Sequence, residues 1–211
     1  MSRLPLDPAG WPFILGALIA GIAIGRFWAW PWAAPLFVLA GFFIFFFRDP
    51  ERRIVDQPDT VVSPADGRVM VAGPAVETAA PPGQWQQISI FLSPMDVHVN
   101  RVPASGRITA VSYKPGSFLA AYNPEAATQN ERSEIWIDHG GQMIVARQIV
   151  GVLARRVVCR AKPGDEVRAG DRYGVMKFGS RMDVYLPLSA ELRVQPGDVV
   201  RGGESVIAVL H

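Results

Sequence analysis

The stretch Lys162-Pro-Gly-Asp-Glu-Val-Arg-Ala-Gly170 decides the fold, because the chain repeats it as Gln195-Pro-Gly-Asp-Val-Val-Arg-Gly-Gly203. Pro-Gly-Asp favours a turn, the residues after it favour a short strand, and the closing glycine favours a second turn. A looser echo relates Ser63-Pro-Ala-Asp-Gly-Arg-Val69 to Val102-Pro-Ala-Ser-Gly-Arg-Ile108. The chain therefore repeats a unit of turn, strand and turn.

Short β-type runs separated by Gly and Pro fill the chain from Val61 onward, so we expect a mostly β fold. The predicted strands are Val61–Ser63, Arg68–Val71, Gln87–Leu92, Gly106–Val111, Glu134–Ile137, Gln142–Ala146 and Val150–Arg160. Residues 115–127 indicate a loop or a brief helix. The Pro-Gly-Asp-x-Val-x-x-Gly unit is typical of lipoyl-like hammerhead, or barrel-sandwich, domains, which supports that fold and says little about function.

Two apolar runs, Trp11–Gly25 and Phe27–Phe47, stand near the N-terminus with only Arg26 between them. The second run is long enough to span a bilayer as a helix. We expect a membrane-associated helical hairpin over residues 1–47, with its turn near Gly25–Arg26. A single span and a re-entrant hairpin in one leaflet are the alternatives. A signal peptide is disfavoured because the apolar region is too long.

Three arginines, Arg48, Arg52 and Arg53, follow the apolar runs at once. Positive residues next to a membrane segment stay on the cytoplasmic side, so we expect a cytoplasmic domain on the cell (inner) membrane. That domain, residues 48–211, holds about 160 residues, which is enough for one hydrophobic core.

Composition excludes several other classes of function. The chain has 211 residues, 49% of them hydrophobic, and a net charge of +2 without a basic run, so no nucleic-acid partner is expected. The single cysteine, Cys159, excludes an internal disulfide and reads as a small core residue. The three histidines (His98, His139 and His211) form no zinc-type spacing, and no metal site is expected.

The stretch Tyr173–Pro187 consists of two short apolar runs joined at Gly179-Ser180-Arg181. Gly179 suits a tightly approached backbone. Ser180 follows it directly, so its hydroxyl lies within reach of the Gly179 carbonyl. On local grounds alone, a hairpin turn with a solvated serine explains this sequence.

Five segments together resemble the phosphatidylserine decarboxylase family, in particular its short form. They are Phe46–Pro50, Ser63–Gly67, Leu92–Pro103, Val150–Arg156 and Phe178–Arg181. Each segment is weak evidence alone, but here all five stand in the order of that family. The resemblance covers about residues 45 to 211.

The resemblance implies a self-cleaving proenzyme of phospholipid biosynthesis. Ser180 would attack the carbonyl of Gly179, and elimination and hydrolysis would leave a pyruvoyl group and release ammonia. A large chain, 1–179, would then pair with a small chain, 180–211, that begins with the pyruvoyl cofactor; further oligomerisation stays open. The pyruvoyl would form a Schiff base with phosphatidylserine, its membrane-borne substrate, and release CO2 and phosphatidylethanolamine.

The catalytic residues that the resemblance implies are Ser180, His98 and Asp66. Arg101 stands where the long form of the family has a second histidine, which leaves open whether His98 serves both steps or His139 supplies the base for self-cleavage. Turn residues are the simpler interpretation of His139 and the local alternative for Asp66. Three cations are open as ligands of the substrate phosphate or carboxylate: Arg101, Lys114 and Arg181.

Two rival functions are a lipoyl or biotinyl carrier and a membrane-anchored adaptor. Met176-Lys177 resembles the modified-lysine turn of carriers, but the lysine comes too soon after Gly170 for their hairpin. An adaptor needs a long helical hairpin in its water-exposed part, and the sequence has no such heptad run.

Overall fold

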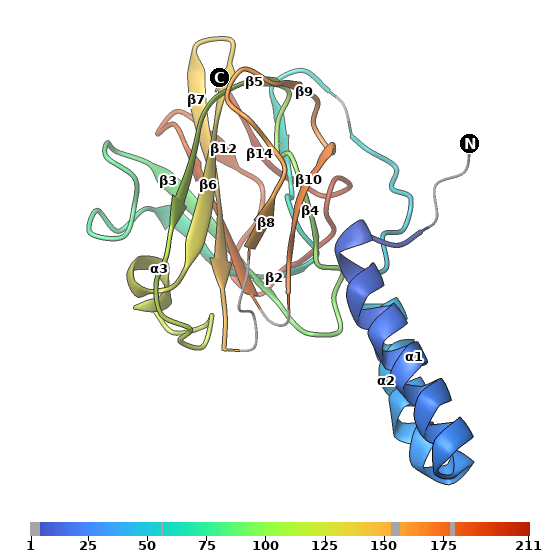
Figure 1. Ribbon diagram of the computed structural model, residues 1–211. Helices are drawn as coiled ribbons and strands as arrows, with labels where there is room; N and C mark the ends of the chain where they lie inside the picture. The colour runs from blue at the N-terminus through green and yellow to red at the C-terminus, as the bar shows by residue number, and fades with distance from the viewer. Residues whose placement is uncertain (1–4, 56, 153–156, 178–179) are drawn as a thin grey trace. The chain divides into compact units, whose positions relative to one another are not determined.

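The computed structural model describes residues 5–55, 57–152, 157–177 and 180–211, and Figure 1 shows its ribbon. The chain divides into a unit of two apolar helices that ends at Glu51 and a β-rich unit that begins at Arg52. The expectation of a mostly β chain that follows N-terminal apolar helices is confirmed.

The N-terminal unit is a pair of adjacent helices that follow a short 3-10 turn: η1 (Pro8–Gly10), α1 (Trp11–Phe27) and α2 (Trp30–Phe46). The turn expected at Gly25–Arg26 is wrong, because the chain turns at Trp28–Ala29. Helix α1 continues through Gly25 since the missing side chain leaves room for the Trp30 ring; a Cβ there would lie 2.6 Å from Trp30 Cε3. Pro31 then suits the first turn of α2.

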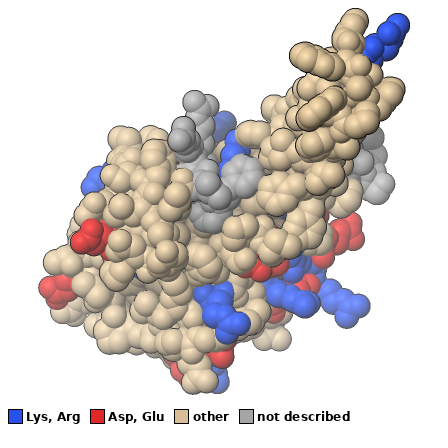
Figure 2. Space-filling model, turned by 90° about the horizontal axis from the view of Figure 1, so that it is seen from below, with Lys and Arg blue, Asp and Glu red and all other residues tan. Residues whose placement is uncertain are grey.

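The two helices are apolar on all sides. Aromatic rings contribute to the contact between them: the ring centroid of Phe13 lies 5.5 Å from that of Phe43 in α2 and 5.6 Å from that of Phe47, which follows α2. Figure 2 shows an almost uncharged surface on this unit. Its large exposed apolar side chains are Trp11, Leu15, Ile19, Ile22, Phe27, Trp28, Trp30, Trp32, Val38, Leu39, Phe42, Ile44 and Phe45. Helices of this kind belong in a protein core or in a membrane.

The segment Pro8–Phe27 is long and apolar enough to cross a membrane, whereas α2 is too short for the same criterion. The sequence led us to expect the reverse. The difference arises because Phe27 ends α1 and the next two residues form the turn, so α2 begins only at Trp30.

Within its described residues, the β-rich unit contains one short helix, α3 (Ala126–Gln129), and strands β1 to β14. The strands are β1 (Thr60–Val62), β2 (Gly67–Pro74), β3 (Gln86–Leu92), β4 (Val99–Arg101), β5 (Gly106–Lys114), β6 (Arg132–His139), β7 (Gln142–Val150), β8 (Val157–Cys159), β9 (Glu166–Val167), β10 (Arg172–Met176), β11 (Ser180–Leu186), β12 (Glu191–Leu192), β13 (Val199–Val200) and β14 (Val206–Val209). One predicted strand, Val150–Arg160, is wrong as a continuous element, because β7 ends at Val150 and Gly151 and Val152 lie outside any strand.

The strands form one large sheet and two small ones, all with antiparallel pairing. The large sheet has the order β13-β2-β3-β11-β7-β6-β5-β9, and the small sheets have the orders β1-β14-β12 and β4-β10-β8. Figure 1 shows the sheets curled around a shared interior. That interior is one apolar cluster, to which β11 contributes Met182, Val184 and Leu186.

The internal repeat forms two equivalent pieces of this structure. In each copy the aspartate closes its own turn: Asp165 accepts a hydrogen bond from Lys162 N at 2.8 Å, and Asp198 accepts one from Gln195 N at 2.9 Å. The short strand that follows then pairs with the start of a long strand, β9 beside Gly106 and β13 beside Gly67. Each close repeat therefore pairs with one of the loose echoes: residues 162–170 lie beside residues 102–108, and residues 195–203 lie beside residues 63–69.

Candidate active site

Ser180 is the first residue of β11, a strand in the middle of the large sheet. It pairs with Leu92 of β3 on one side and with Val150 of β7 on the other. Side chains alternate along a strand, so Ser180 lies on the same face as Met182, which belongs to the apolar core. Ser180 is completely buried. The solvated turn serine that its local sequence favours is therefore wrong.

The Ser180 hydroxyl has an unusual environment for a buried polar group. Its Oγ makes no hydrogen bond with any residue that the structure describes. Most buried hydroxyls have a partner, because burying one without a partner costs about 1–3 kcal/mol. A serine retained under that cost is a candidate for chemistry. Gly179, the other half of the expected cleavage site, lies outside the described residues.

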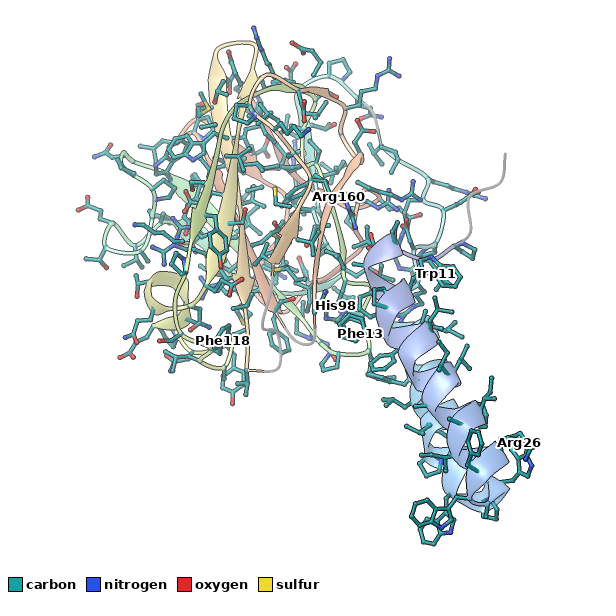
Figure 3. All side chains as sticks on the ribbon, viewed as in Figure 1. Trp11, Phe13, Arg26, His98, Phe118 and Arg160 are labelled. Carbon is teal, nitrogen blue, oxygen red and sulfur yellow. The ribbon has the colours of Figure 1, made fainter. Side chains whose placement is uncertain are left out.

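His98, labelled in Figure 3, directly precedes β4. It is also completely buried. Its Nδ1 donates a hydrogen bond to the carbonyl of Asp96 at 2.9 Å. A carbonyl can only accept, so in the neutral ring the lone pair lies on Nε2, the atom that can accept or deliver a proton. The carbonyl of His98 accepts a hydrogen bond from Met176 at the end of β10, four residues before Ser180 along the chain.

Asp66 directly precedes β2, at the same end of the large sheet as Ser180. Arg68 of β2 pairs with Phe91, and Phe91 pairs with Arg181. The Asp66 carboxylate accepts hydrogen bonds from Arg52 NH2 and from Gly202 N, each at 2.8 Å. Within the described residues, the hydrogen-bond partners of the Asp66 carboxylate are therefore Arg52 and Gly202 and not His98 or Ser180. Asp66 is thus placed near the site and held by other partners.

His139 lies far from Ser180. It pairs with Gln142 where β6 turns into β7, whereas Ser180 pairs with Val150 at the other end of β7. Eight residues of strand separate these two ends by about 26 Å. The Nδ1 atom of His139 donates to the Ser105 carbonyl at 2.7 Å. This placement agrees with the turn interpretation of His139 rather than with a role beside Ser180.

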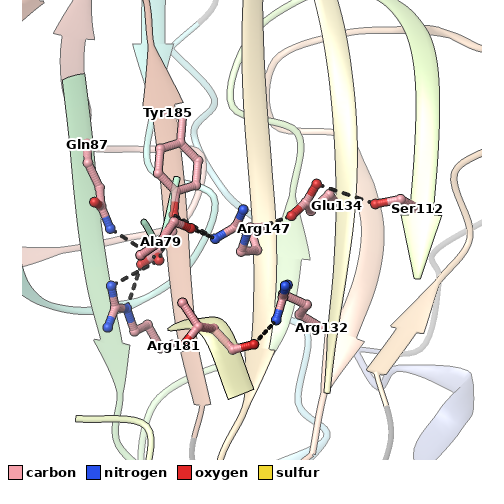
Figure 4. Close-up of polar contacts among 10 residues, drawn as sticks. Ala79, Gln87, Ser112, Arg132, Glu134, Arg147, Arg181 and Tyr185 are labelled. Carbon is pink, nitrogen blue, oxygen red and sulfur yellow. Dashed lines mark hydrogen bonds and ion pairs between the residues drawn. The ribbon is translucent and has the colours of Figure 1, made fainter. Parts of the chain in front are cut away.

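The opposite face of β11 carries a buried network of charges (Figure 4). Arg181 donates to Asp183 through Nε at 2.6 Å and through NH2 at 3.0 Å. Asp183 also accepts from Gln87 at 3.2 Å and from Tyr185 at 3.3 Å. Burial and the neighbouring Asp183 charge raise the pKa of Tyr185 far above its ordinary value. Arg181 is therefore paired with Asp183, which disfavours the role of substrate ligand that the sequence left open for it.

The other two candidate cations lie on different elements. Arg101, at the end of β4, is buried and donates through NH1 to the Gly170 carbonyl at 2.9 Å. Lys114, at the end of β5, is exposed. No group of three metal-ligating side chains is found within the described ranges.

Sequence reasoning missed two buried amides on the core side of the sheets, Asn100 of β4 and Gln148 of β7. Gln148 Nε2 donates to Asn100 Oδ1 at 2.8 Å. The sequence feature that could have indicated Asn100 is its position two residues after His98, because residues two apart in an extended segment point to the same side.

Comparison with known proteins agrees with this arrangement. The family model described as phosphatidylserine decarboxylase matches residues 39–208. A phosphatidylserine decarboxylase proenzyme of Nitrosomonas europaea is 41% identical over 203 residues, which cover 96% of this chain and 94% of that protein. The proenzyme of Symbiobacterium thermophilum is 44% identical over 100% of this chain and 98% of its own length.

A third relative, the phosphatidylserine decarboxylase proenzyme of Salinibacter ruber, is 45% identical over 192 residues, covering 87% of this chain and 85% of that protein. The match thus extends over nearly the whole chain and includes the strands around Ser180. The chain belongs to the phosphatidylserine decarboxylase family, in its short form, and is the proenzyme of a carboxy-lyase that carries a pyruvoyl group made from one of its own serines.

Proposed function

We propose that Ser180 is the serine that becomes the pyruvoyl group. The observation that carries the proposal is its buried hydroxyl, which has no hydrogen-bond partner among the described residues and stands at the first position of a central strand. A small group derived from this side chain fits that place, because the surrounding face is the apolar core and holds no charged side chain of β11.

Self-cleavage follows from a hydroxyl next to the bond that breaks. Ser180 Oγ attacks the carbonyl carbon of Gly179, the C–N bond breaks, and the proton passes to the released amine, which gives an ester. Elimination then frees the Gly179 carboxylate and leaves an enamine at position 180. Its imine form takes up one water and releases ammonia. The net change is one water consumed and one ammonia released, with chains 1–179 and 180–211 as products.

His98 serves the lipid reaction as proton donor. A pyruvoyl group made from Ser180 would supply the carbonyl that condenses with the amine of phosphatidylserine, with loss of one water, and would serve as the sink for the electron pair when CO2 leaves. The carbon that loses CO2 must then gain a proton, and a histidine can supply it near neutral pH. The hydrogen bond from Nδ1 to Asp96 fixes the ring so that Nε2 is the exchanging atom. Arg101 cannot replace it, because a guanidinium stays protonated.

Asp66 assists self-cleavage as a positioning residue. Its contacts with Arg52 and Gly202 hold the start of β2. Because β2 is next to β3, and β3 pairs with Ser180, the charge of Asp66 is fixed at the end of the sheet where the cleavage occurs.

The repeat pairs support the finer fold assignment as a barrel-sandwich hammerhead of the lipoyl type. In this proposal residues 48–211 are the catalytic domain and residues 1–47 are a membrane-associated helical hairpin. Arg48, Arg52 and Arg53 favour an inner-membrane protein whose catalytic domain is cytoplasmic. Its two chains remain together as a heterodimer, because β11 of the small chain lies between β3 and β7 of the large one.

Exposed apolar side chains support access to Ser180 from a lipid surface. Met95 and Val152 follow β3 and β7 just after the residues that pair with Ser180, and both are exposed. Tyr122 is exposed as well, and its ring lies 6.4 Å from that of Phe91. Exposed apolar side chains beside the strand ends that pair with Ser180 suit a substrate whose headgroup lies at the membrane interface.

The test is a denaturing gel with intact masses for the wild type, Ser180→Ala and the control Ser189→Ala, an exposed serine of the same small chain. Wild type and Ser189→Ala should give two fragments, and Ser180→Ala should give one uncut chain without decarboxylase activity. Cleavage of Ser180→Ala at the same bond would remove Ser180 from the mechanism. A single intact wild-type chain with an adduct on Lys177 would instead indicate a carrier.

A further inference from the structure

The buried pair Asn100 and Gln148 is incompletely satisfied. Both residues are completely buried, and one hydrogen bond of 2.8 Å joins Gln148 Nε2 to Asn100 Oδ1. Asn100 Nδ2 and Gln148 Oε1 have no hydrogen-bond partner in the described part of the chain. The pair therefore presents one unused donor group and one unused acceptor, a combination that buried side chains seldom keep unless something else completes it.

The strand pairings place this pair beside Ser180. Gln148 pairs with Met182 and Val150 pairs with Ser180, so Gln148 and Ser180 are diagonal neighbours on the core face of the sheet. Diagonal neighbours across antiparallel strands lie about 7–8 Å apart, within reach of a small ligand. Asn100 stands two residues after His98 and shares its side of an extended segment. Asn100 is thus a neighbour of His98, and Gln148 is a neighbour of Ser180.

A glycine keeps the Gln148 amide in this position. Gly174 of β10 pairs with Asn100, and a Cβ on Gly174 would lie 2.7 Å from Gln148 Nε2 and 2.5 Å from the Val158 carbonyl. Any side chain at position 174 would displace the amide. The site is therefore built from three strands, β4, β7 and β10, around one polar pair.

The unused groups complement an amino-acid headgroup. A carboxylate accepts hydrogen bonds and matches the unused Nδ2 donor of Asn100, whereas an amine donates and matches the unused Oε1 acceptor of Gln148. A neutral donor can recognise the carboxylate without the strong stabilisation that an ion pair would give, so it opposes the loss of CO2 less than an arginine would.

We propose that Asn100 donates a hydrogen bond from Nδ2 to the carboxylate of the substrate headgroup and that Gln148 holds Asn100 in place. The pair thereby selects lipids with a serine headgroup. The proposal rests on Ser180 as the source of the pyruvoyl group. Asn100 touches the substrate, and Gln148 is a positioning residue that also receives the amine as it approaches.

The test compares two lipids that differ only in the carboxylate, phosphatidylserine and phosphatidylethanolamine, in detergent micelles with the full-length protein. Cyanoborohydride captures each amine on the pyruvoyl group, and the capture is read as added mass on the 180–211 fragment. Asn100→Asp keeps the shape and the acceptor for Gln148 but removes the donor, and Gln148→Met removes the support. Gln142→Met is the control, since Gln142 lies at the other end of β7 and donates to the His211 carbonyl.

All three variants should be cut into two fragments. Asn100→Asp and Gln148→Met should capture phosphatidylserine about tenfold to a hundredfold more slowly than wild type, the range expected for a lost hydrogen bond to a charged group. With phosphatidylethanolamine, Asn100→Asp should react at nearly the wild-type rate, and Gln148→Met, which also lacks the acceptor for the amine, should lose less than it does with phosphatidylserine. Gln142→Met should match wild type with both lipids.

Equal losses for the two lipids would show a merely structural role, and no loss for phosphatidylserine would show that Asn100 does not touch the carboxylate; either result overturns the proposal. Accumulation of uncut Asn100→Asp would assign the pair to maturation and overturn it too. Failure of the underlying function is recognised separately, because wild-type protein would then lack the cut before Ser180 and would capture neither lipid.

Discussion

Asp66 and Ser105 occupy equivalent positions in the two halves of the internal repeat, and each accepts a hydrogen bond from the closing turn of its half. Gly202 N donates to Asp66 at 2.8 Å, and Ala169 N donates to Ser105 Oγ at 2.9 Å. A serine at this position can therefore accept the hydrogen bond from the closing turn as well as an aspartate can. What Asp66 adds is its negative charge and the contact with Arg52.

This equivalence allows the structural role of Asp66 to be tested apart from the role in self-cleavage that we propose for its carboxylate. Asp66→Ser should keep the Gly202 contact and be more stable to urea than Asp66→Ala by about 1 kcal/mol, the value of one hydrogen bond. Asp66→Ser, Asp66→Ala and Asp66→Asn should all mature slowly, as followed by the fraction of cut chain over time. Ser105→Ala, the control, should be destabilised but mature at the normal rate. Normal maturation of Asp66→Ser would show that the carboxylate has no chemical role.

His98→Ala should separate maturation from lipid turnover. If His98 serves only the lipid reaction, the variant is cut before Ser180, carries pyruvoyl and releases little phosphatidylethanolamine, with a loss of about 10²–10⁴-fold for a general acid. Fragment masses and a product assay measure the two steps. His139→Ala should behave like wild type, since it lies at the far end of β7. Accumulation of uncut His98→Ala would assign the histidine to both steps, and full turnover would remove it from catalysis.

The pair Arg181–Asp183 should be a major determinant of stability. Asp183→Ala leaves a buried guanidinium without its carboxylate and should lower the free energy of unfolding by about 3–5 kcal/mol. The control is Glu191→Ala, which breaks the half-exposed pair with Arg193 and should cost less than about 1 kcal/mol. Urea unfolding of the two variants provides the comparison. Similar losses in both would contradict the buried network.

The helices up to Phe46 should hold the full-length protein in the membrane through apolar contacts. Neither high salt nor alkaline carbonate should release it, because salt weakens only electrostatic attachment. Ile19→Lys places a charge on an exposed apolar position of α1 and should increase release, whereas Val199→Lys on the β-rich unit should not. Complete release of wild type by carbonate would reduce the helices to a peripheral contact.

Cys159 should react slowly with alkylating reagents in the folded protein. Burial raises the pKa of its thiol, so at about pH 8 the folded chain holds less of the reactive thiolate than an unfolded chain does. Folding also becomes less favourable as the pH rises above the ordinary thiol pKa, because the unfolded state then loses its proton first. Alkylation followed by mass should accelerate on unfolding in urea. Equal rates in both states would show an exposed, ordinary thiol.

The sequence predicts the β class and the repeat because turn residues act locally: the aspartates Asp165 and Asp198 close turns within their own segments. The burial of Ser180 could not be predicted in this way. Its neighbours read as a turn, and only the long-range pairing with Leu92 and Val150 places it inside a sheet. The Asn100–Gln148 contact also depends on strands far apart in the chain, for which one sequence gives no register.

The turn between the helices shows the same limit at shorter range. Gly25 and Arg26 look like a break between apolar runs, but the Trp30 ring packs against Gly25 and helix α1 continues past both residues. Gly25 therefore makes room for a packed side chain and does not form a turn. Only the position of the Trp30 ring distinguishes these two roles of a glycine.

The most direct test of the proposed role of Ser180 is the mass of the C-terminal fragment from purified wild-type protein. Self-cleavage at Ser180 predicts a fragment 180–211 that is lighter by one ammonia than the same peptide with an N-terminal serine, and that gains mass with a hydrazine reagent specific for ketones. It also predicts a fragment 1–179 with a free carboxylate. A protein that releases phosphatidylethanolamine while its chain stays intact, or whose pyruvoyl-bearing fragment begins at another serine, would contradict the central role of Ser180.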